Sequence, residues 1–384
     1  MSKKIFRNIL IVCVAAFLMA AVSIGLCANY LLSYKPSTDG DKSNTYVYTD
    51  EYGNRQVIQA NQLEGSYNFL VMGHDRAALL TDVIMLINYN INTSSVTLMQ
   101  FPRDTYVSYD VPTHKINATF STYYNQALSE GKDQETARLS ALESVADMFE
   151  ESLGITIYKS AVMNLDGFSG IVDALGGVEV NVPSDLYYSD PAQGLYINLR
   201  AGYQTLNGEK AEQFVRYRAG YLQADLGREN AQKIFMSAFI QKAKNSINIS
   251  NVGTLTNVAT EIINNLTTNI TVSDMVYFAK SFLGGVSLSN INMMTVPGSA
   301  LSNEYGGSYY VINRNALLDI VSANYNTTDI SDSIFKQNFD KNIYFTDLNS
   351  NAFTNAYYST EIPQISESFN AQSVIDDSIE IPKY

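Results

Sequence analysis

The stretch NFLVMGHDRAALLTDVIMLINYNINTSSVTLMQFPRDTYV, residues 68–107, contains three apolar runs separated by short polar turns. The runs are NFLVM at 68–72, DVIMLINY at 82–89 and VTLMQF at 96–101. Near-continuous apolar runs of this length are typical of strands that helices cover on both faces. Pro102 cannot donate a ladder hydrogen bond, so the third strand is predicted to end there and to place Arg103 and Asp104 at a strand end.

Helical patterns follow these strands along the chain. Between Gln134 and Leu153 the apolar residues fall at helical spacing, and Gly154 fits a C-terminal stop. Further helices are predicted at 165–175, after Asn207, at about 228–247 and at 273–283, and further strands at 178–182, 293–298 and 309–314. Together these elements predict an α/β fold with three α-β-α layers around a mixed, largely buried central sheet.

The N-terminus predicts a single membrane anchor. Residues 1–8 carry Lys3, Lys4 and Arg7, and residues 9–32 contain no charge over a length that crosses a ~30 Å hydrocarbon core as a helix. The positive-inside rule leaves residues 1–8 in the cytoplasm and the main domain extracellular, as a single-pass protein of the cell membrane. A cleavable signal peptide is the alternative, but no A-x-A site follows the apolar run.

The rest of the chain divides by composition. Residues 33–66 are polar and predict an extracellular stalk, residues 67–325 predict the folded domain, and residues 326–384 predict a polar, weakly ordered tail with one docked strand. Both cysteines, Cys13 and Cys27, lie in the apolar run, so the folded domain has no disulfide, and a lipoprotein site at Cys27 is set aside because Leu26 is too bulky. The net charge of −13 argues against a nucleic-acid partner.

Four of the ten arginines gather in three short motifs. They are Arg103 in FPRDTYV, Arg216 and Arg218 in VRYR at 215–218, and Arg228 in DLGREN at 225–230. The guanidinium fork holds phosphate oxygens bidentately, so the clustering predicts a focused site for a phosphate-bearing substrate. Structural ion pairs with Asp104 and Asp225 are the alternative. Arg216 and Arg218 can face one site only if the chain between them is extended.

The ordered series of motifs resembles the LytR-CpsA-Psr family of cell-wall glycopolymer ligases over residues 68–325. The series is NFLVMGHD, TDVIML, FPRDTYV, KIN at 115–117, NLDGFSGIVDALGGVEVNVP at 164–183, GYQTLNGEKA at 202–211, VRYR, and DLGREN followed by Gln232. The resemblance implies a phosphotransferase. Such an enzyme moves a teichoic-acid-like or capsular glycopolymer from a polyprenyl-pyrophosphate carrier to peptidoglycan, forms a phosphodiester and releases polyprenyl phosphate.

The same resemblance implies roles for single residues. Asp75 and Asp82 would hold Mg²⁺ or Mn²⁺, and an aspartate of this pair ranks first as the base. The pyrophosphate-binding set would be Arg103, Arg216, Arg218 and Arg228, with Asp225 and Gln232 completing the wall. Asp104 would orient the arginines. The expected catalytic residues are thus Asp82, Arg103, Asp104, Arg216 and Arg218.

A polyprenyl tail also requires an apolar tunnel, since burial contributes ~0.8 kcal/mol per CH₂. The helices at 135–153 and 228–247 are its predicted walls, although their apolar stripes also suit an ordinary core.

Two positions depart from the family pattern. Leu80 and Ala231 stand where arginine is common in the family, and Arg76 or His74 is a candidate replacement for the first. Two alternative functions follow from the missing charges. One is a degenerate member that binds lipid-linked glycan and acts as an envelope regulator, and the other is a hydrolase of polyprenyl-pyrophosphate glycan that uses water as the acceptor.

Overall fold

The structure is a computed structural model that describes most of the chain between residues 65 and 325. The described residues are 33–36, 45–49, 55–59, 65–74, 79–107, 111–191, 195–218, 224–246, 256, 259–260, 262–302, 307–325 and 369–370.

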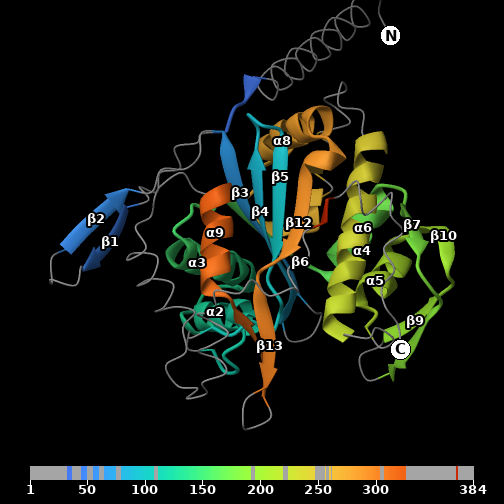
Figure 1. Ribbon diagram of the computed structural model, residues 1–384, viewed down its shortest axis with the longest axis horizontal. Helices are drawn as coiled ribbons and strands as arrows, with labels where there is room; N and C mark the ends of the chain where they lie inside the picture. Colours follow the sequence, from blue (N-terminus) through green and yellow to red (C-terminus); the bar gives the residue numbers. More distant parts are fainter. Residues whose placement is uncertain are drawn as a thin grey trace, which may run out of the picture.

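Within these residues, seven strands form a mixed sheet at the centre of the fold (Figure 1). In order across the sheet they are β11 (Thr267–Thr268), β6 (Lys159–Asn164), β3 (Ser66–His74), β4 (Thr81–Asn90), β5 (Ser95–Gln100), β12 (Ile291–Thr295) and β15 (Phe369–Asn370). β3 pairs in parallel with β6 and β5 with β12, whereas β4 is antiparallel to both of its neighbours. The prediction of an α/β fold around a mixed sheet is confirmed.

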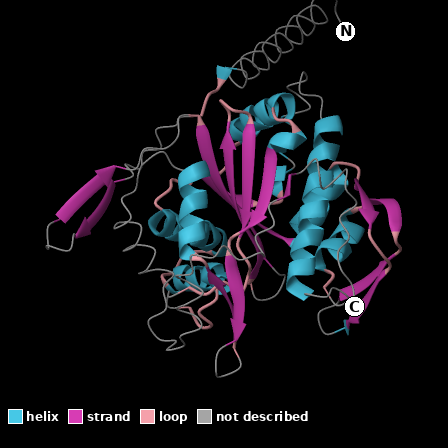
Figure 2. Cartoon of the chain, viewed as in Figure 1, coloured by secondary structure: helices cyan, strands magenta, loops and turns pink. Residues whose placement is uncertain are grey.

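Helices cover both faces of this sheet (Figure 2). One face carries α2 (Thr119–Ser129), α3 (Gln134–Leu153) and α9 (Arg314–Asn324), and the other carries α6 (Ala224–Ser246) and α8 (Val272–Gly285). Successive side chains of a strand point to opposite faces of the sheet, so one strand packs against the helices on both faces. Leu70 and Met72 of β3 pack with α2, α3 and α9, whereas Phe69 packs against Phe278 of α8 with ring centroids 5.1 Å apart. The continuous apolar run of β3 therefore contributes to two cores.

A smaller lobe lies beside α6 (Figure 1, green). It contains two antiparallel pairs, β7 (Val178–Val182) with β10 (Gly202–Leu206) and β8 (Leu186–Asp190) with β9 (Leu195–Leu199), together with α4 (Leu165–Ala174) and α5 (Gly208–Arg216). Its separate core includes Val180, Leu199 and Phe214 and extends to Ala231 of α6. The sequence predicted α4, α5 and β7, but β8, β9 and β10 were not predicted.

Short elements complete the described fold. β1 (Thr45–Thr49) pairs with β2 (Arg55–Gln59), β13 (Gly298–Ser302) pairs with β14 (Ser308–Ile312), and two 3-10 turns cover Ile116–Ala118 and Leu288–Asn290. β1 and β2 lie within the segment predicted as a stalk. α2 and α9 were not predicted because neither shows a long apolar stripe. In α2 only four side chains are buried: Thr119, Phe120, Tyr124 and Ala127.

In the described part of the chain, every helix is too short or too polar to cross a membrane. The predicted anchor at 9–32 and residues 1–8 lie outside the described residues, as does the C-terminal segment from 326 onward apart from β15. β15 pairs with β12, so a strand of that C-terminal segment does dock on the sheet.

Tyr34 joins the N-terminal end of the described chain to α8. Its hydroxyl donates to Oδ1 of Asp274 at 2.5 Å, and the Tyr158 hydroxyl donates to the same oxygen at 2.7 Å. Asp274 is 1% exposed and forms a capping box with Thr271 at the start of α8. The chain therefore contacts the folded domain at residue 34, ahead of most of the segment predicted as a stalk.

α3 begins and ends at its predicted residues. Asp133 accepts hydrogen bonds from the backbone N–H groups of Glu135 and Thr136, which satisfies two donors at the helix start. Gly154 ends the helix in the left-handed region with a φ of 63°.

We expect Gly154→Ala to lower the free energy of unfolding by about 1–2 kcal/mol, because a side chain in the left-handed conformation meets the following carbonyl oxygen. Urea unfolding followed by circular dichroism measures the change. Gly285→Ala is the matched control, since Gly285 lies in the last turn of α8 and its added Cβ would meet only Ser94 Oγ, at 3.5 Å. Equal losses in the two variants would contradict the assignment of strain to residue 154.

Candidate functional site

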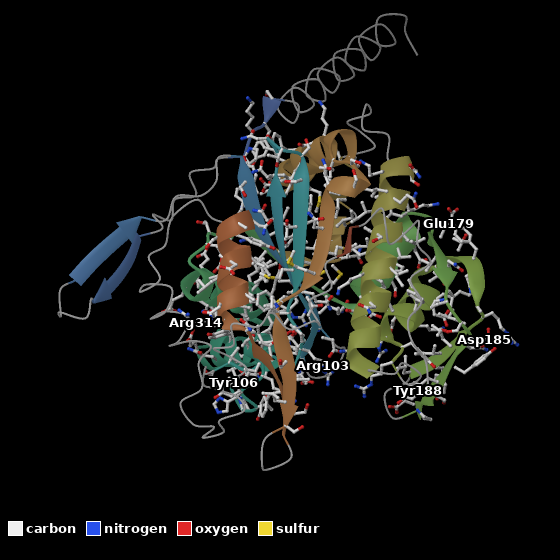
Figure 3. All side chains as sticks on the ribbon, in the orientation of Figure 1. Arg103, Tyr106, Glu179, Asp185, Tyr188 and Arg314 are labelled. Atoms are coloured by element: carbon white, nitrogen blue, oxygen red, sulfur yellow. The ribbon has the colours of Figure 1, made fainter. Side chains whose placement is uncertain are left out.

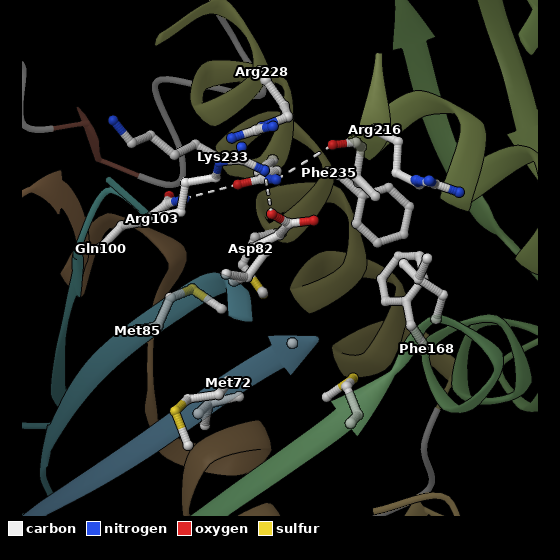
Figure 4. Close-up of a pocket in the computed structure, with 18 of the residues that line it drawn as sticks. Met72, Asp82, Met85, Gln100, Arg103, Phe168, Arg216, Arg228, Lys233 and Phe235 are labelled. Carbon is white, nitrogen blue, oxygen red and sulfur yellow. Dashed lines mark hydrogen bonds and ion pairs between the residues drawn. The ribbon is translucent and has the colours of Figure 1, made fainter. Parts of the chain in front are cut away.

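A cavity of about 320 Å³ lies between the sheet, α6 and the small lobe (Figure 4). Among the described residues its wall includes a single carboxylate, Asp82, and five cationic side chains. The cationic side chains are Arg103, Arg216, Arg218, Arg228 and Lys233. In a chain with a net charge of −13, this local excess of positive charge favours an anionic ligand.

Arg103 and Asp82 form an ion pair inside this cavity. Nη1 of Arg103 donates to Oδ1 of Asp82 at 2.6 Å, with the two side chains 31% and 41% exposed. The local sequence explains the pairing, because β5 ends at Gln100, Pro102 stops the ladder, and Arg103 then lies beside the first residues of β4. Figure 3 shows Arg103 at the lower end of the sheet, near α6. Arg103 therefore lies at a strand end, as predicted.

Arg216 and Arg218 reach the cavity from the end of α5. The helix ends at Arg216, and Tyr217 has an extended backbone with φ −65° and ψ 132°. The chain between the two arginines is thus extended, and both side chains line the cavity, as predicted. Arg216 also donates to Glu212 at 2.9 Å. Tyr217 itself packs in the core of the small lobe, and this burial raises the pKa of its hydroxyl.

α6 contributes Arg228 and Gln232 to the same wall. Arg228 is 7% exposed, and Gln232 lies one turn further along the helix. The Gln232 amide accepts a hydrogen bond from Gln100 at 2.8 Å and donates to the carbonyl of Val215 at 3.3 Å. The structure thus brings four predicted arginines and Gln232 together, while the side chain of Asp225 lies outside the described part.

Asp104 pairs with Arg103, as predicted, and more closely with a second cation, Lys115. Lys115 donates to its Oδ1 at 2.8 Å, whereas Nε of Arg103 is 3.9 Å from the same oxygen. Asp104 is not part of the cavity wall. Its neighbour is set by the isolated bridge between Tyr106 and Lys115, which brings the KIN motif alongside the strand end. Any influence of Asp104 on Arg103 is therefore shared with Lys115.

The rest of the cavity wall is largely apolar. Six of the eleven methionines line it, namely Met72, Met85, Met163, Met236, Met293 and Met294, together with Phe168 and Phe235. α6 is one wall of this cavity, as was predicted for the wall of the lipid tunnel, and the tunnel itself stays a prediction. The helix at 134–153 was the other predicted wall, and that prediction is wrong, because α3 packs on the opposite face of the sheet.

Asp82 is the one predicted metal ligand that lies among the described residues. No three His, Cys, Asp or Glu side chains among them lie close enough to hold a metal ion together. Asp75 falls in residues 75–78, which lie outside the described part. Asp82 interacts through Oδ1 with Arg103. One or two carboxylates completed by substrate phosphates are a usual Mg²⁺ ligand set, so Asp82 fits as one ligand.

The two departures from the family pattern face away from the cavity. Leu80 packs with the core formed by α2, α3 and α9, and Ala231 is fully buried in the core of the small lobe. His74 lines the cavity and stacks on Phe120 with ring centroids 6.0 Å apart. Arg76 lies outside the described residues.

Sequence reasoning missed Gln100 and Lys233. Both line the cavity, and Lys233 donates to Oγ1 of Thr295 at 3.0 Å. A signal for Gln100 was present, because it is the single amide in the apolar run VTLMQF. A polar side chain in a buried strand needs a partner, but the sequence does not say which.

Comparison with known proteins places these features in context. A model of the LytR_cpsA_psr family matches residues 32–326. The polyisoprenyl-teichoic acid–peptidoglycan teichoic acid transferase TagV of Bacillus subtilis is 26% identical over 80% of this chain and 75% of its own. The corresponding TagU of Bacillus mycoides is 30% identical over 63% of this chain and 71% of its own. The crystal structure of B. subtilis TagV aligns with a TM-score of 0.53 at 22% identity, over 72% of this chain and 98% of its own.

Proposed function

Because the chain belongs to the LytR-CpsA-Psr family, we propose that it transfers a teichoic-acid-like or capsular glycopolymer from a polyprenyl-pyrophosphate carrier to peptidoglycan. The observation that carries the proposal is the cavity, in which arginines surround one carboxylate and methionines and phenylalanines form most of the remaining wall. A pyrophosphate on an isoprenoid tail has the same division between a charged end and an apolar end. Relatives named as teichoic acid transferases support this substrate class.

The reaction is a phosphoryl transfer that the arginines assist. A hydroxyl of peptidoglycan attacks the phosphorus next to the glycan and forms a new P–O bond. The bond from that phosphorus to the bridging oxygen breaks, the electron pair leaves with polyprenyl phosphate, and the hydroxyl proton passes to a base. Arg103, Arg216, Arg218 and Arg228 neutralise the charge that develops on the phosphate oxygens. Asp82 is the first candidate for the base.

A divalent cation completes this proposal. Mg²⁺, or Mn²⁺ in its place, would be held by Asp82 with Asp75 and the substrate phosphates, and it would supply further neutralisation of phosphate charge. Arg103 already pairs with Asp82. The carboxylate therefore holds the guanidinium of Arg103 at the cavity wall, beside a residue that would bind the cation.

The protein would act at the outer face of the cell membrane. The apolar run at 9–32 and the positive charges before it support a single-pass anchor with the N-terminus in the cytoplasm and the domain extracellular. This placement suits both partners, since the lipid carrier lies in the membrane and peptidoglycan lies outside it.

Transfer is tested with the full-length chain in detergent, a short polyprenyl-pyrophosphate glycan, Mg²⁺ and a peptidoglycan fragment. Mass spectrometry follows the covalent product and polyprenyl phosphate together. We expect both to appear in equal amounts and to disappear when EDTA is added. Phosphate-bond cleavage without a joined product would favour the hydrolase. Lipid that binds but never turns over would favour the regulator, and either result would overturn the proposal.

A further inference from the structure

A buried amide side chain, that of Gln100, meets the half-buried amide of Gln232 at the edge of the cavity. Nε2 of Gln100 donates to Oε1 of Gln232 at 2.8 Å, and Nε2 of Gln232 donates to the backbone carbonyl of Val215 at 3.3 Å. Gln100 is 6% exposed. Both ends of the Gln232 amide are therefore engaged by the protein, so this side chain is held in place before any substrate arrives.

These two hydrogen bonds, called the amide relay below, connect the three segments that carry the arginines. Gln100 is the last residue of β5, three positions before Arg103. Gln232 follows Arg228 by one turn of α6, and Val215 directly precedes Arg216 at the end of α5. The two hydrogen bonds thus join the end of β5 to two helices that begin more than a hundred residues later in the sequence.

A second contact fixes α6 against the same strand ends. Lys233 follows Gln232 and donates to Oγ1 of Thr295, and Thr295 is the register partner of Gln100 where β12 runs beside β5. Rotation or sliding of α6 would break the amide relay and this bond together. These contacts of Gln232 and Lys233 therefore fix α6, and with it Arg228, relative to the strand end that precedes Arg103.

We propose that Gln100 is a positioning residue, which acts through Gln232 to hold Arg103, Arg216 and Arg228 at the spacing that a pyrophosphate requires. The proposal rests on the proposed function and adds a residue whose role is to hold the arginines in position through Gln232. Its physical basis is preorganisation, because guanidinium groups that are already in place need no rearrangement when phosphate charge arrives.

An equivalent amide pair elsewhere in the sheet provides a matched control. Nδ2 of Asn88 donates to Oδ1 of Asn68 at 2.7 Å, and Nδ2 of Asn68 donates to the carbonyl of Thr156 at 2.9 Å. Both asparagines are buried, and neither lines the cavity. Asn88→Leu removes this bond and the bond that Asn88 donates to Oγ of Ser66, without touching the segments that carry the arginines.

The test compares binding of geranylgeranyl pyrophosphate with binding of geranylgeraniol, which lacks the charged group, to the full-length chain in detergent. Both ligands carry the same apolar tail, so a change in how the apolar wall binds the tail affects both dissociation constants equally. Their ratio therefore measures recognition of the pyrophosphate alone. The variants are Gln100→Met, Gln232→Met, the double variant and Asn88→Leu. The thermal unfolding of each variant shows whether it is folded. If Gln100→Met does not fold, Gln232→Met removes the same hydrogen bond between Gln100 and Gln232.

We expect the wild type to prefer the pyrophosphate and Gln100→Met to reduce this preference about 10-fold, with binding of the alcohol unchanged. The double variant should lose no more than Gln232→Met alone, since both changes remove one relay. Asn88→Leu should keep the wild-type preference. An unchanged preference in Gln100→Met, or an equal loss in Asn88→Leu, would overturn the positioning role. A wild type with no preference would overturn the proposed function itself and the inference with it.

Discussion

Arg103→Ala is expected to reduce glycopolymer transfer by about 100- to 1,000-fold, because it removes a cation aimed at the charge that develops on phosphate. The change also releases Asp82, whose Oδ1 accepts from Arg103 at 2.6 Å. Asp82→Ala should give a loss of similar size and should in addition abolish the response to Mg²⁺. Initial rates of polyprenyl phosphate release, measured over a range of Mg²⁺ concentrations, report both effects.

Stability should be nearly unaffected in these variants. Both side chains are about a third exposed or more, and ion pairs in such positions contribute ~1 kcal/mol or less. Arg200→Ala is the matched control, because Arg200 pairs with Asp185 at 3.3 Å on the surface of the small lobe, outside the cavity. A rate for Arg103→Ala within threefold of the rate for Arg200→Ala would show that Arg103 does not bind the phosphate.

The second large effect concerns stability. Asp274→Ala should lower the free energy of unfolding by about 3–5 kcal/mol, the usual cost of breaking a buried charged network by removing one partner. Asp274 accepts hydrogen bonds from the hydroxyls of Tyr34, Tyr158 and Thr271 and from the backbone N–H of Thr271. The variant leaves these donors without their acceptor and also removes the capping box of α8.

Acid should weaken the same network in the wild type. Burial by itself would raise the pKa of Asp274, but hydrogen bonds from Tyr34, Tyr158 and Thr271 outweigh burial and hold the pKa below its ordinary value. The folded state therefore keeps the carboxylate ionised where the unfolded chain would bind a proton. This contribution to stability is present above the unfolded pKa of ~3.9 and is lost as the pH falls through the folded value.

Urea unfolding at a series of pH values between 3 and 7 tests both statements. Asp274→Asn should flatten the acid limb of the stability curve, since the amide does not titrate. Asp166→Asn is a suitable control, because Asp166 is an exposed carboxylate in the first turn of α4 and lies outside this network. If the free energy of unfolding of Asp274→Asn falls with decreasing pH as steeply as that of the wild type, other carboxylates cause the pH dependence.

The local pattern of the sequence predicts much of the site. FPRDTYV places Arg103 at a strand end because Pro102 stops the ladder, and the spacing of VRYR requires the extended chain that the structure has at Tyr217. The start and end of α3 follow from Asp133 and Gly154, whose effects act within one turn. These features depend on residues close in sequence, which periodicity and capping rules describe well.

Partners that are distant in sequence were not predictable in this way. Asp104 was expected to orient the arginines, and its second and closer partner, Lys115 at 2.8 Å, was not predicted, because a bridge at Tyr106 brings the KIN motif beside it. The bond from Gln100 to Gln232 spans 132 positions and depends on how α6 packs across the sheet. Neither pairing can be predicted from the residues close by in sequence, because the partner is determined by how the elements pack in the folded core.

The bond between Tyr34 and Asp274 has a consequence for how an anchored chain would search for its substrates. A domain on a flexible linker of about thirty residues would move within about 30 Å of its attachment point and would meet the bilayer at any angle. If residues 9–32 are the anchor proposed above, attachment at Tyr34, two residues later, would remove almost all of that freedom. The domain would then present its cavity to the lipid surface at one angle, which reduces the orientational entropy lost when the carrier enters.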